Sequence, residues 1–306
     1  MNEKKTLKIN FLFVFFSIII LYAFLFPTPV KCDPADLNNL SDSQKKLLKE
    51  HVFGGLPSKD NIYIRQGYIL CFNPQTKTPR WSAYHIKPEY LVTPKRKGKF
   101  ATFRNDPDIE NEATDQDYTG LFTKRGYARG HLAPYAVMGG DRNDNGKYAE
   151  DDSSDALTIY QANYLSNIAP QQHYAFNGSP GLWWSLERWI QDYLVKEKRN
   201  EVWVFAGCIF GPGEQEKVGK NNDITVPPLF YKLVIMEDPD TGVPKILAFL
   251  FPHQRASHGK IEDFLVTVDI LEALSGVDFF NELDDATENK LEDQDTWEVW
   301  EREFKE

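Results

Sequence analysis

The most informative stretch of the 306-residue chain is GYARGHLAP, residues 126–134. Alternate side chains of an extended strand point to the same side, so this stretch predicts a strand on which Arg129 and His131 share a face. Gly130 between them lets a backbone or a ligand come close. A guanidinium binds phosphate oxygens while a neutral imidazole accepts a proton from water, a combination that suits phosphodiester chemistry. Taken alone, this stretch favours a histidine in a core position with a satisfied hydrogen bond.

A second informative stretch begins at Tyr164 with the letters YLSNIAPQ and is followed by Asn177. Residues 181–197 then predict a helix, because apolar side chains recur along one face. Ser179 is the predicted N-cap and Pro180 lies near the first turn. The recurring apolar positions are Leu182, Leu186, Trp189, Ile190 and Tyr193.

Two oxygen-bearing side chains flank the start of this predicted helix. Asn177 lies on its approach, and at ~100° per residue Glu187 is ~40° from Trp183, at the edge of the apolar face. Amide and carboxylate oxygens suit Mg²⁺, which keeps most of its waters and needs few protein ligands. On these residues alone, a helix cap and a surface carboxylate are the default interpretation.

Strand-like segments lie on both sides of this central region. They combine alternation with aromatic and β-branched residues and are not interleaved regularly with helices, which predicts an α+β fold class with a mixed or antiparallel central sheet and flanking helices. A composition of 42% hydrophobic and 26% charged residues excludes wholesale disorder. The expected strands cover residues 62–72, 80–86, 201–210, 229–236 and 245–251, and a further helix is expected over 261–274.

Three motifs, in this order along the chain, resemble those of the DNA/RNA non-specific endonuclease family, the endonuclease G-like members of the ββα-metal (His-Me finger) nucleases. Ala128-Arg-Gly-His131 corresponds to the family's Asp-Arg-Gly-His. Asn167-Ile-Ala-Pro-Gln171 and Asn177 with Gly181-Leu-Trp-Trp-Ser-Leu-Glu187 correspond to the next two motifs. The resemblance extends over about residues 54–280 and implies a ββα-metal active site.

The resemblance implies a catalytic role for each matched position. His131 would be the general base, Asn177 the direct ligand of one hydrated Mg²⁺, and Glu187 the group that holds or orients a metal-bound water. Arg129 would bind the scissile phosphate, and Asn167 would support the site from its loop. Mn²⁺ suits the same oxygen site. The expected activity is cleavage of DNA and RNA with little sequence specificity, leaving a 5′-phosphate.

The sequence departs from the family pattern at three places. Ala128 replaces the usual aspartate, which we expect to tune activity more than remove it. Three residues, 178–180, separate Asn177 from the next motif, and this leaves Asn163 as an alternative metal ligand. Lys77 stands where the family often has arginine, and lysine binds phosphate only as a point charge.

Charge sets limits on how the chain meets nucleic acid. With 35 basic and 45 acidic residues the net charge is −10, which argues against coating of nucleic acid by bulk charge. The chain has a local basic run that includes Lys95, Arg96 and Lys97. Such a run is either a solvated surface or a rim that contacts phosphates. We take it as part of the predicted substrate-binding set, which comprises Arg129, Lys77, Lys95, Arg96 and Lys97.

The chain begins with lysines and then the uncharged apolar residues 11–26, which is typical of a secretory signal peptide ending near residue 32. We therefore expect a secreted or periplasmic protein, with a membrane anchor formed by residues 11–26 as the alternative. The first arginine is Arg65, which disfavours a mitochondrial presequence. Residues 33–53 are expected to be a lead-in, 54–283 the endonuclease domain and 284–306 an acidic tail.

Two rival functions stay open at this stage. One is a non-catalytic nucleic-acid-binding relative, for which Ala128 is the hint, and the other is a phosphodiesterase acting on another substrate. The expected partners are DNA and RNA, a homodimer is compatible with the resemblance, and a membrane enters only if the N-terminal segment is uncleaved. In an exported chain Cys71 and Cys208 either form a disulfide or stay buried thiols.

Overall fold

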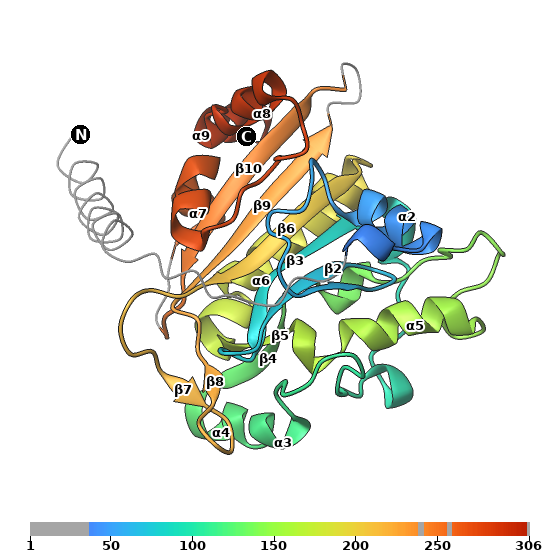
Figure 1. Ribbon diagram of the computed structural model, residues 1–306, viewed down its shortest axis with the longest axis vertical. Coiled ribbons are helices and arrows are strands. Elements are labelled where there is room, and N and C mark those ends of the chain that lie inside the picture. The colour runs from blue at the N-terminus through green and yellow to red at the C-terminus, as the bar shows by residue number, and fades with distance from the viewer. Residues whose placement is uncertain (1–36, 238–241, 256–258, 305–306) are drawn as a thin grey trace.

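The computed structural model describes residues 37–237, 242–255 and 259–304 (Figure 1). The predicted signal peptide or anchor at residues 1–32 lies outside the described residues. Within the described ranges, no helix has both the length and the apolar character needed to cross a membrane.

A seven-stranded antiparallel sheet forms the centre of the molecule, with the strand order β1-β2-β3-β6-β9-β10-β11 (Figure 1). Together with its flanking helices this sheet confirms the predicted α+β class. The strands are β1 (Ile62–Ile64), β2 (Ile69–Asn73), β3 (Thr78–Ile86), β6 (Val202–Ile209), β9 (Leu229–Glu237), β10 (Pro244–Pro252) and β11 (Leu265–Val266).

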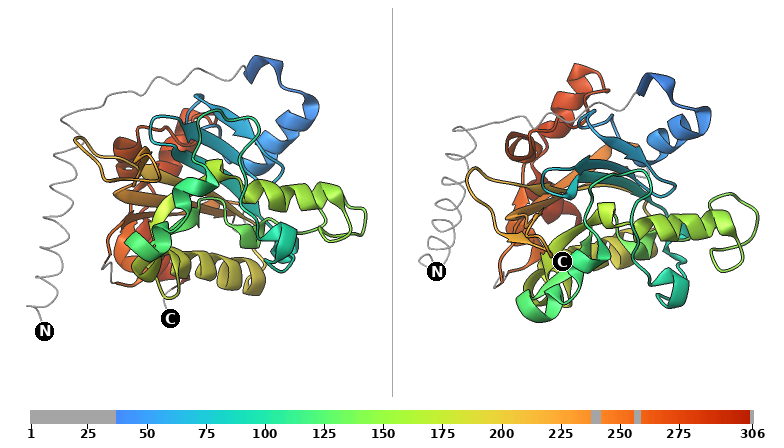
Figure 2. Two further views of the ribbon diagram at one scale, coloured as in Figure 1. Left: turned by 90° about the horizontal axis from the view of Figure 1, so that it is seen from below. Right: turned by 60° about the horizontal axis from the view of Figure 1, so that its bottom comes forward.

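Helices cover both faces of this sheet, so that its strands are apolar on both sides (Figure 2). In β9, Phe230 and Val234 join one hydrophobic cluster while Leu233 and Ile235 join the other, as the two-residue period of a strand requires. One face packs α5 (Ser153–Ala162), α6 (Leu182–Arg188) and α9 (Thr296–Glu303), and the other packs α2 (Asp42–His51), α7 (Val268–Ser275) and α8 (Asp285–Glu292).

A separate two-stranded antiparallel sheet carries the first two sequence motifs; residues 132–167, including α5, connect its strands, and it is called the hairpin below for its shape alone. In it β4 (Tyr127–His131) pairs antiparallel with β5 (Ile168–Gln172), so that His131 lies opposite Ile168. A π-helical turn, His173–Asn177, leads from β5 toward α6. The order strand, strand, helix is the arrangement that the resemblance implied.

A third hydrophobic cluster joins this hairpin to a small subdomain at one end of the molecule (Figure 1). Tyr127 of the hairpin packs there with Tyr118 and Val218. The subdomain consists of α3 (Asp115–Tyr118), α4 (Leu121–Arg125) and the two-stranded ribbon of β7 (Lys217–Val218) and β8 (Ile224–Thr225).

Two helix predictions need correction. The helix over 181–197 begins at Leu182 with Gly181 as its N-cap, so the prediction of Ser179 as the cap is wrong. A Cβ at position 181 would lie 2.4 Å from the Phe176 carbonyl oxygen, so only glycine fits there. The helix predicted over 261–274 is shorter, because residues 261–266 form a 3-10 turn and β11 before α7 begins.

The segments predicted as lead-in and tail both contain helices that pack on the sheet. His51 at the end of α2 is 1% exposed, and Val299 and Trp300 of α9 are buried, with Trp300 centred 4.9 Å from the ring of Trp189. The domain boundaries at residues 53 and 283 stay predictions.

The two cysteines lie on different strands. Cys71 of β2 is a buried thiol whose Sγ donates a hydrogen bond to the Asp60 carbonyl at 3.0 Å, and Cys208 of β6 is also buried. They belong to the hydrophobic clusters on opposite faces of the sheet, so the disulfide alternative does not apply to this fold.

Candidate active site

His131 ends strand β4 and is 8% exposed. Its Nε2 lies 3.1 Å from Oδ1 of Asn163, which caps the C-terminus of α5. The amide of Asn163 is itself fixed, because its Nδ2 donates to the Phe100 carbonyl at 3.0 Å.

This contact assigns the histidine tautomer. A carbonyl oxygen only accepts, so Phe100 fixes which end of the Asn163 amide is nitrogen and leaves Oδ1 facing His131. The Nε2 atom of His131 must then carry the hydrogen that it donates to Oδ1. The lone pair of the neutral ring therefore lies on Nδ1, the nitrogen that can accept a proton.

The surroundings of His131 favour this neutral form. The pKa of His131 is lowered to about 3, mainly by burial and to a lesser extent by the nearby Arg96 guanidinium, while the bond with Asn163 opposes both effects. At neutral pH the imidazole is thus an uncharged base. This is the protonation state that the predicted role of His131 requires.

The basic side chains of the site lie around the ring of Phe103. Its centre is 5.4 Å from the His131 ring and 5.1 Å from each guanidinium carbon of Arg96 and Arg129. Arg96 also donates to Oδ1 of Asn163 at 3.4 Å. The sequence predicted Arg96 and Arg129 as phosphate ligands, and the fold brings both to the same aromatic ring as the candidate base.

Arg129 is held by an exposed partner. Its Nη2 donates to the Asp115 carboxylate at 2.5 Å, and Asp115 has 63% of its side chain in solvent. The Arg129 Nε is buried and has no hydrogen-bond partner among the described residues. A guanidinium with an unsatisfied donor and an exposed, replaceable counter-ion suits the binding of an anion.

The remaining predicted phosphate ligands lie apart from this ring. Lys95 and Lys97 are exposed beside Arg96, as a solvated rim would be. Lys77, in the turn between β2 and β3, forms an ion pair with Asp223 at 2.8 Å.

Asn167 is a brace within the protein. It is fully buried, its Nδ2 donates to the carbonyls of Ala133 and Ala162 at 2.9 Å, and its Oδ1 accepts from the Ala133 amide at 3.0 Å. These bonds tie the chain just after His131 to the end of α5. These bonds make Asn167 a positioning residue, and its role in catalysis stays a prediction.

Asn177 lies on the side of the hairpin opposite to His131 and approaches strand β4 from there. Its Nδ2 donates to Oε1 of Gln171, and that oxygen lies 2.1 Å from the place where a Cβ on Gly130 would stand. Only a glycine at position 130 leaves room for this side chain, so Gly130 is required by the Gln171–Asn177 contact. The Oδ1 of Asn177 remains the acceptor end of its amide.

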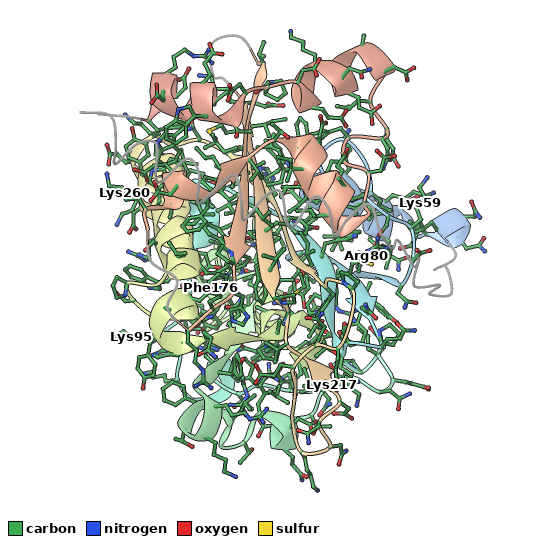
Figure 3. The ribbon with its side chains drawn as sticks, turned by 90° about the vertical axis from the view of Figure 1, so that its left-hand side faces the viewer. Lys59, Arg80, Lys95, Phe176, Lys217 and Lys260 are labelled. Atoms are coloured by element: carbon green, nitrogen blue, oxygen red, sulfur yellow. The ribbon has the colours of Figure 1, made fainter. Side chains whose placement is uncertain are left out.

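Glu187 of α6 forms an ion pair with Lys232, which is 0% exposed in the middle of β9. The two charged atoms are 2.8 Å apart, and the lysine Nζ also lies 4.1 Å from the centre of the Trp183 ring. Burial raises the pKa of Glu187, and the attraction of Lys232 opposes that rise. Phe176 packs beside this pair, 5.5 Å from the Trp183 ring, between α6 and the strands (Figure 3).

The predicted residues therefore lie in three groups. His131, Arg96 and Arg129 surround Phe103, Asn177 bonds to Gln171, and Glu187 bonds to Lys232. Gly130 links the first two groups, because it lies between Arg129 and His131 on β4 and contacts Gln171.

Sequence reasoning missed four residues of this site. Asn163 was considered only as an alternative metal ligand, Gln171 was noted only as the last residue of the second motif, and Phe103 carried no signal of its own. Lys232 did carry one, since it is a single charge within the apolar strand sequence FYKLVIM, residues 230–236. A charge at an inward position of a buried strand indicates a buried partner.

Comparisons with known proteins show which family the chain resembles. Residues 50–286 match the family model described as DNA/RNA non-specific endonuclease. The protein named Nuclease EXOG, mitochondrial, from Xenopus laevis is 26% identical over 261 residues, covering 81% of this chain and 66% of that protein. Endonuclease G, mitochondrial, from Homo sapiens is 28% identical over 237 residues, covering 74% of this chain and 71% of that protein.

A solved structure shares the fold. The chain in the crystal structure of the EndoG/EndoGI complex superimposes with a TM-score of 0.62 at 22% identity, covering 80% of this chain and 94% of that one. The present chain spans less than two thirds of some of its relatives, 66% of the Xenopus laevis nuclease and 59% of its Danio rerio counterpart.

Proposed function

Because the chain belongs to the DNA/RNA non-specific endonuclease family, we propose that it hydrolyses phosphodiester bonds of DNA and RNA with little sequence preference. The observation that carries this proposal is the neutral His131, with its Nδ1 lone pair, beside two arginines on one aromatic ring. A base and two phosphate ligands within one cluster are what this hydrolysis needs.

In the proposed reaction, Nδ1 of His131 takes a proton from water while the water oxygen bonds to phosphorus. The bond from phosphorus to the 3′ oxygen breaks, the 3′ oxygen takes a proton from solvent, and the phosphate stays on the 5′ side. Asn163 holds the ring in the required tautomer. Arg129 exchanges Asp115 for the substrate phosphate, and readout through phosphates alone gives little sequence preference.

We further propose one Mg²⁺, with Mn²⁺ as the alternative, held through Asn177 and, by way of water, Glu187. The donors fit, because the fixed Nδ2 of Asn177 leaves its amide oxygen as the ligand atom and Glu187 supplies a carboxylate. A bound cation would polarise the phosphoryl oxygen and stabilise the leaving oxygen. Lys232 of β9 holds the Glu187 carboxylate toward the sheet and so fixes its position.

Export is also a proposal. The lysine-rich start and the apolar residues 11–26 support a cleaved signal peptide and a secreted or periplasmic enzyme, with an anchored form as the alternative. The relatives are named as mitochondrial proteins, so fractionation of cells expressing the full chain, with N-terminal sequencing of the mature form, decides the matter.

Nicking of supercoiled plasmid by the full-length protein tests the proposed activity. We expect cleavage with Mg²⁺, no cleavage with EDTA, and a loss of about 10²-fold or more for His131→Ala, as for removal of a general base. A thermal unfolding curve matching that of the wild type shows that the variant is folded.

Two other outcomes would overturn the proposal. Binding of DNA without cleavage in Mg²⁺ or Mn²⁺ would support a non-catalytic relative, for which Ala128 is the sequence hint. Turnover of a small chromogenic diester without plasmid cleavage would support a phosphodiesterase with another substrate.

A further inference from the structure

Three aromatic side chains form a patch on the surface beside the candidate site. Phe122 of α4 is 42% exposed and Tyr174 of the π-helical turn is 73% exposed. His173 lies between them, with ring centres 4.9 Å from Phe122 and 5.2 Å from Tyr174. Single exposed rings are ordinary, but a contiguous cluster of them indicates a contact surface.

The patch is fixed to the same backbone as the catalytic residues. The amide of His173 donates to the Gly126 carbonyl at 2.9 Å, and Gly126 directly precedes β4. The ring of His173 also lies over Gly178, where a Cβ would be 2.6 Å from the ring, so a larger residue does not fit. The turn that presents these rings ends at Asn177, the proposed metal ligand.

Exposed cations border the patch. Lys124 and Arg125 follow Phe122 on the short helix α4, and Arg125 donates to the Lys217 carbonyl at 3.0 Å and lies 3.4 Å from the Glu216 carboxylate. Along β4, Arg129 is three residues beyond Gly126, which is ~10 Å at the usual rise of a strand.

We propose that Phe122, His173 and Tyr174 form a stacking subsite for unpaired bases of the nucleic acid whose phosphate is cleaved. The inference rests on the proposed function and names a preferred form of its substrate, single-stranded or locally unpaired nucleic acid. Aromatic rings accept the face of every base, so the subsite adds affinity without sequence preference. Bases inside a duplex present only their edges, so they gain nothing from it.

The position of the patch favours this occupant over a protein. Two of its rings belong to the turn that ends at Asn177, and the third belongs to α4, which also carries two cations that suit a phosphate backbone. A strand bound with its scissile phosphate at Arg129 would pass the rings within a few nucleotides.

Binding of labelled 12-nucleotide strands to full-length protein in EDTA tests the proposal. Three probes are compared, a single strand, a matched strand without bases, and a duplex. We expect Tyr174→Ala and Phe122→Ala each to weaken binding of the single strand by about 10-fold, within the range for loss of one stacked base. Binding of the other two probes should stay unchanged, and Tyr174→Trp should restore the affinity.

Tyr148→Ala is the matched control, because Tyr148 is 46% exposed on the loop before α5, away from the hairpin. Equal losses for the strand with bases and the strand without them, or no loss for either variant, would overturn the stacking subsite. Wild-type protein that cuts plasmid while its Tyr174 and Phe122 variants bind all probes normally would refute this inference alone. Wild-type protein that neither binds nor cuts nucleic acid would refute the proposed function as well.

Discussion

His131 and His85 are both buried imidazoles with polar partners, but their neighbours have opposite character. His131 donates to the neutral amide of Asn163 and lies near arginines. His85 of β3 lies between two carboxylates, 3.2 Å from Glu50 and 3.1 Å from Glu201, and stacks on Trp203 with ring centres 4.0 Å apart. The amide and the nearby cations keep the His131 ring neutral and able to accept a proton. The two carboxylates beside His85 instead make that ring a bridge between secondary-structure elements.

The His85 bridge joins α2 to the sheet. Glu50 belongs to α2 and also accepts from the Tyr90 hydroxyl at 2.8 Å, while Glu201 immediately precedes β6. The hydrogen bond with His85 lowers the pKa of Glu50, so this carboxylate stays ionised in the folded protein. The comparison therefore separates the histidine that we propose for chemistry from a histidine that joins two elements of the fold.

The largest expected effect comes from removing each ring in turn. We expect His131→Ala to lower plasmid cleavage by about 10²-fold or more with a small change in stability. For His85→Ala we expect cleavage within a few fold of the wild type and a loss of about 1–3 kcal/mol in the free energy of unfolding, because Glu50 loses a buried partner. Nicking assays and urea denaturation of the same two variants measure both quantities. Equal losses of cleavage in the two variants would remove the distinction.

The pH dependence of the free energy of unfolding tests the low pKa values of the buried histidines. Burial lowers the pKa of His131 and His51 to about 3 and that of His253 to about 4. An unfolded histidine takes up a proton near pH 6.5, so the unfolded state is favoured as pH falls below that value. Each of the three can contribute up to ~1.4 kcal/mol per pH unit until the folded pKa is reached.

We therefore expect the free energy of unfolding to fall with pH below about 6.5, and His131→Asn to flatten that slope by the share of one histidine. Glu50 has a lowered pKa in the folded state, so its contribution is lost only as pH falls below about 4.5. Glu50→Gln should then change the slope in the lower range alone. Urea denaturation at pH 7, 6, 5 and 4 distinguishes the two ranges, and an unchanged slope in His131→Asn would show that this ring titrates normally.

The sequence identified the chemical groups of the site better than their surroundings. The strand pattern predicted the α+β class, and the period of two placed Arg129 and His131 on one face. The motif order placed Asn177 and Glu187 around the start of α6. These features follow from local periodicity and from residue type, which a single sequence contains.

The missed features depend on contacts between distant segments. Asn163 and His131 are 32 residues apart, and Lys232 meets Glu187 across 45 residues, so no local pattern reveals either pair. The prediction of Ser179 as the N-cap of α6 was wrong for a related reason. The backbone of Phe176 lies so close to position 181 that only a glycine fits there, and this glycine is the N-cap. The helix α5 was also missed, because its first residues lie in a stretch rich in Asp and Ser that resembles a loop.

Exchanging the amide for a carboxylate would give His131 the environment of His85. In Asn163→Asp, a negative charge near Nε2 favours the protonated ring and should raise the pKa of His131 by about one to two units. The acid limb of the cleavage rate should move to higher pH, with about 10-fold less cleavage at low pH and recovery at high pH. Asn163→Ala removes the bond without adding charge, so it should lower cleavage across the whole pH range. A parallel loss in both variants would mean that Asn163 acts only on ring position.

The smallest expected effect is the change in the pKa of His131 when the charge of Arg96 is removed. The Arg96 guanidinium is the second cause, after burial, of the low pKa of His131, so Arg96→Gln should raise that pKa by less than a unit. Because Arg96 is also a proposed phosphate ligand, the variant should raise KM as well, and the two effects need separate readouts. Titration of the His131 ring by NMR without substrate reports the pKa alone, while the salt dependence of binding reports the lost phosphate contact. Lys97→Gln is the matched control, since Lys97 is exposed one residue away and should change only the salt dependence. An identical His131 titration in wild type and Arg96→Gln would leave burial as the whole reason that this ring stays neutral.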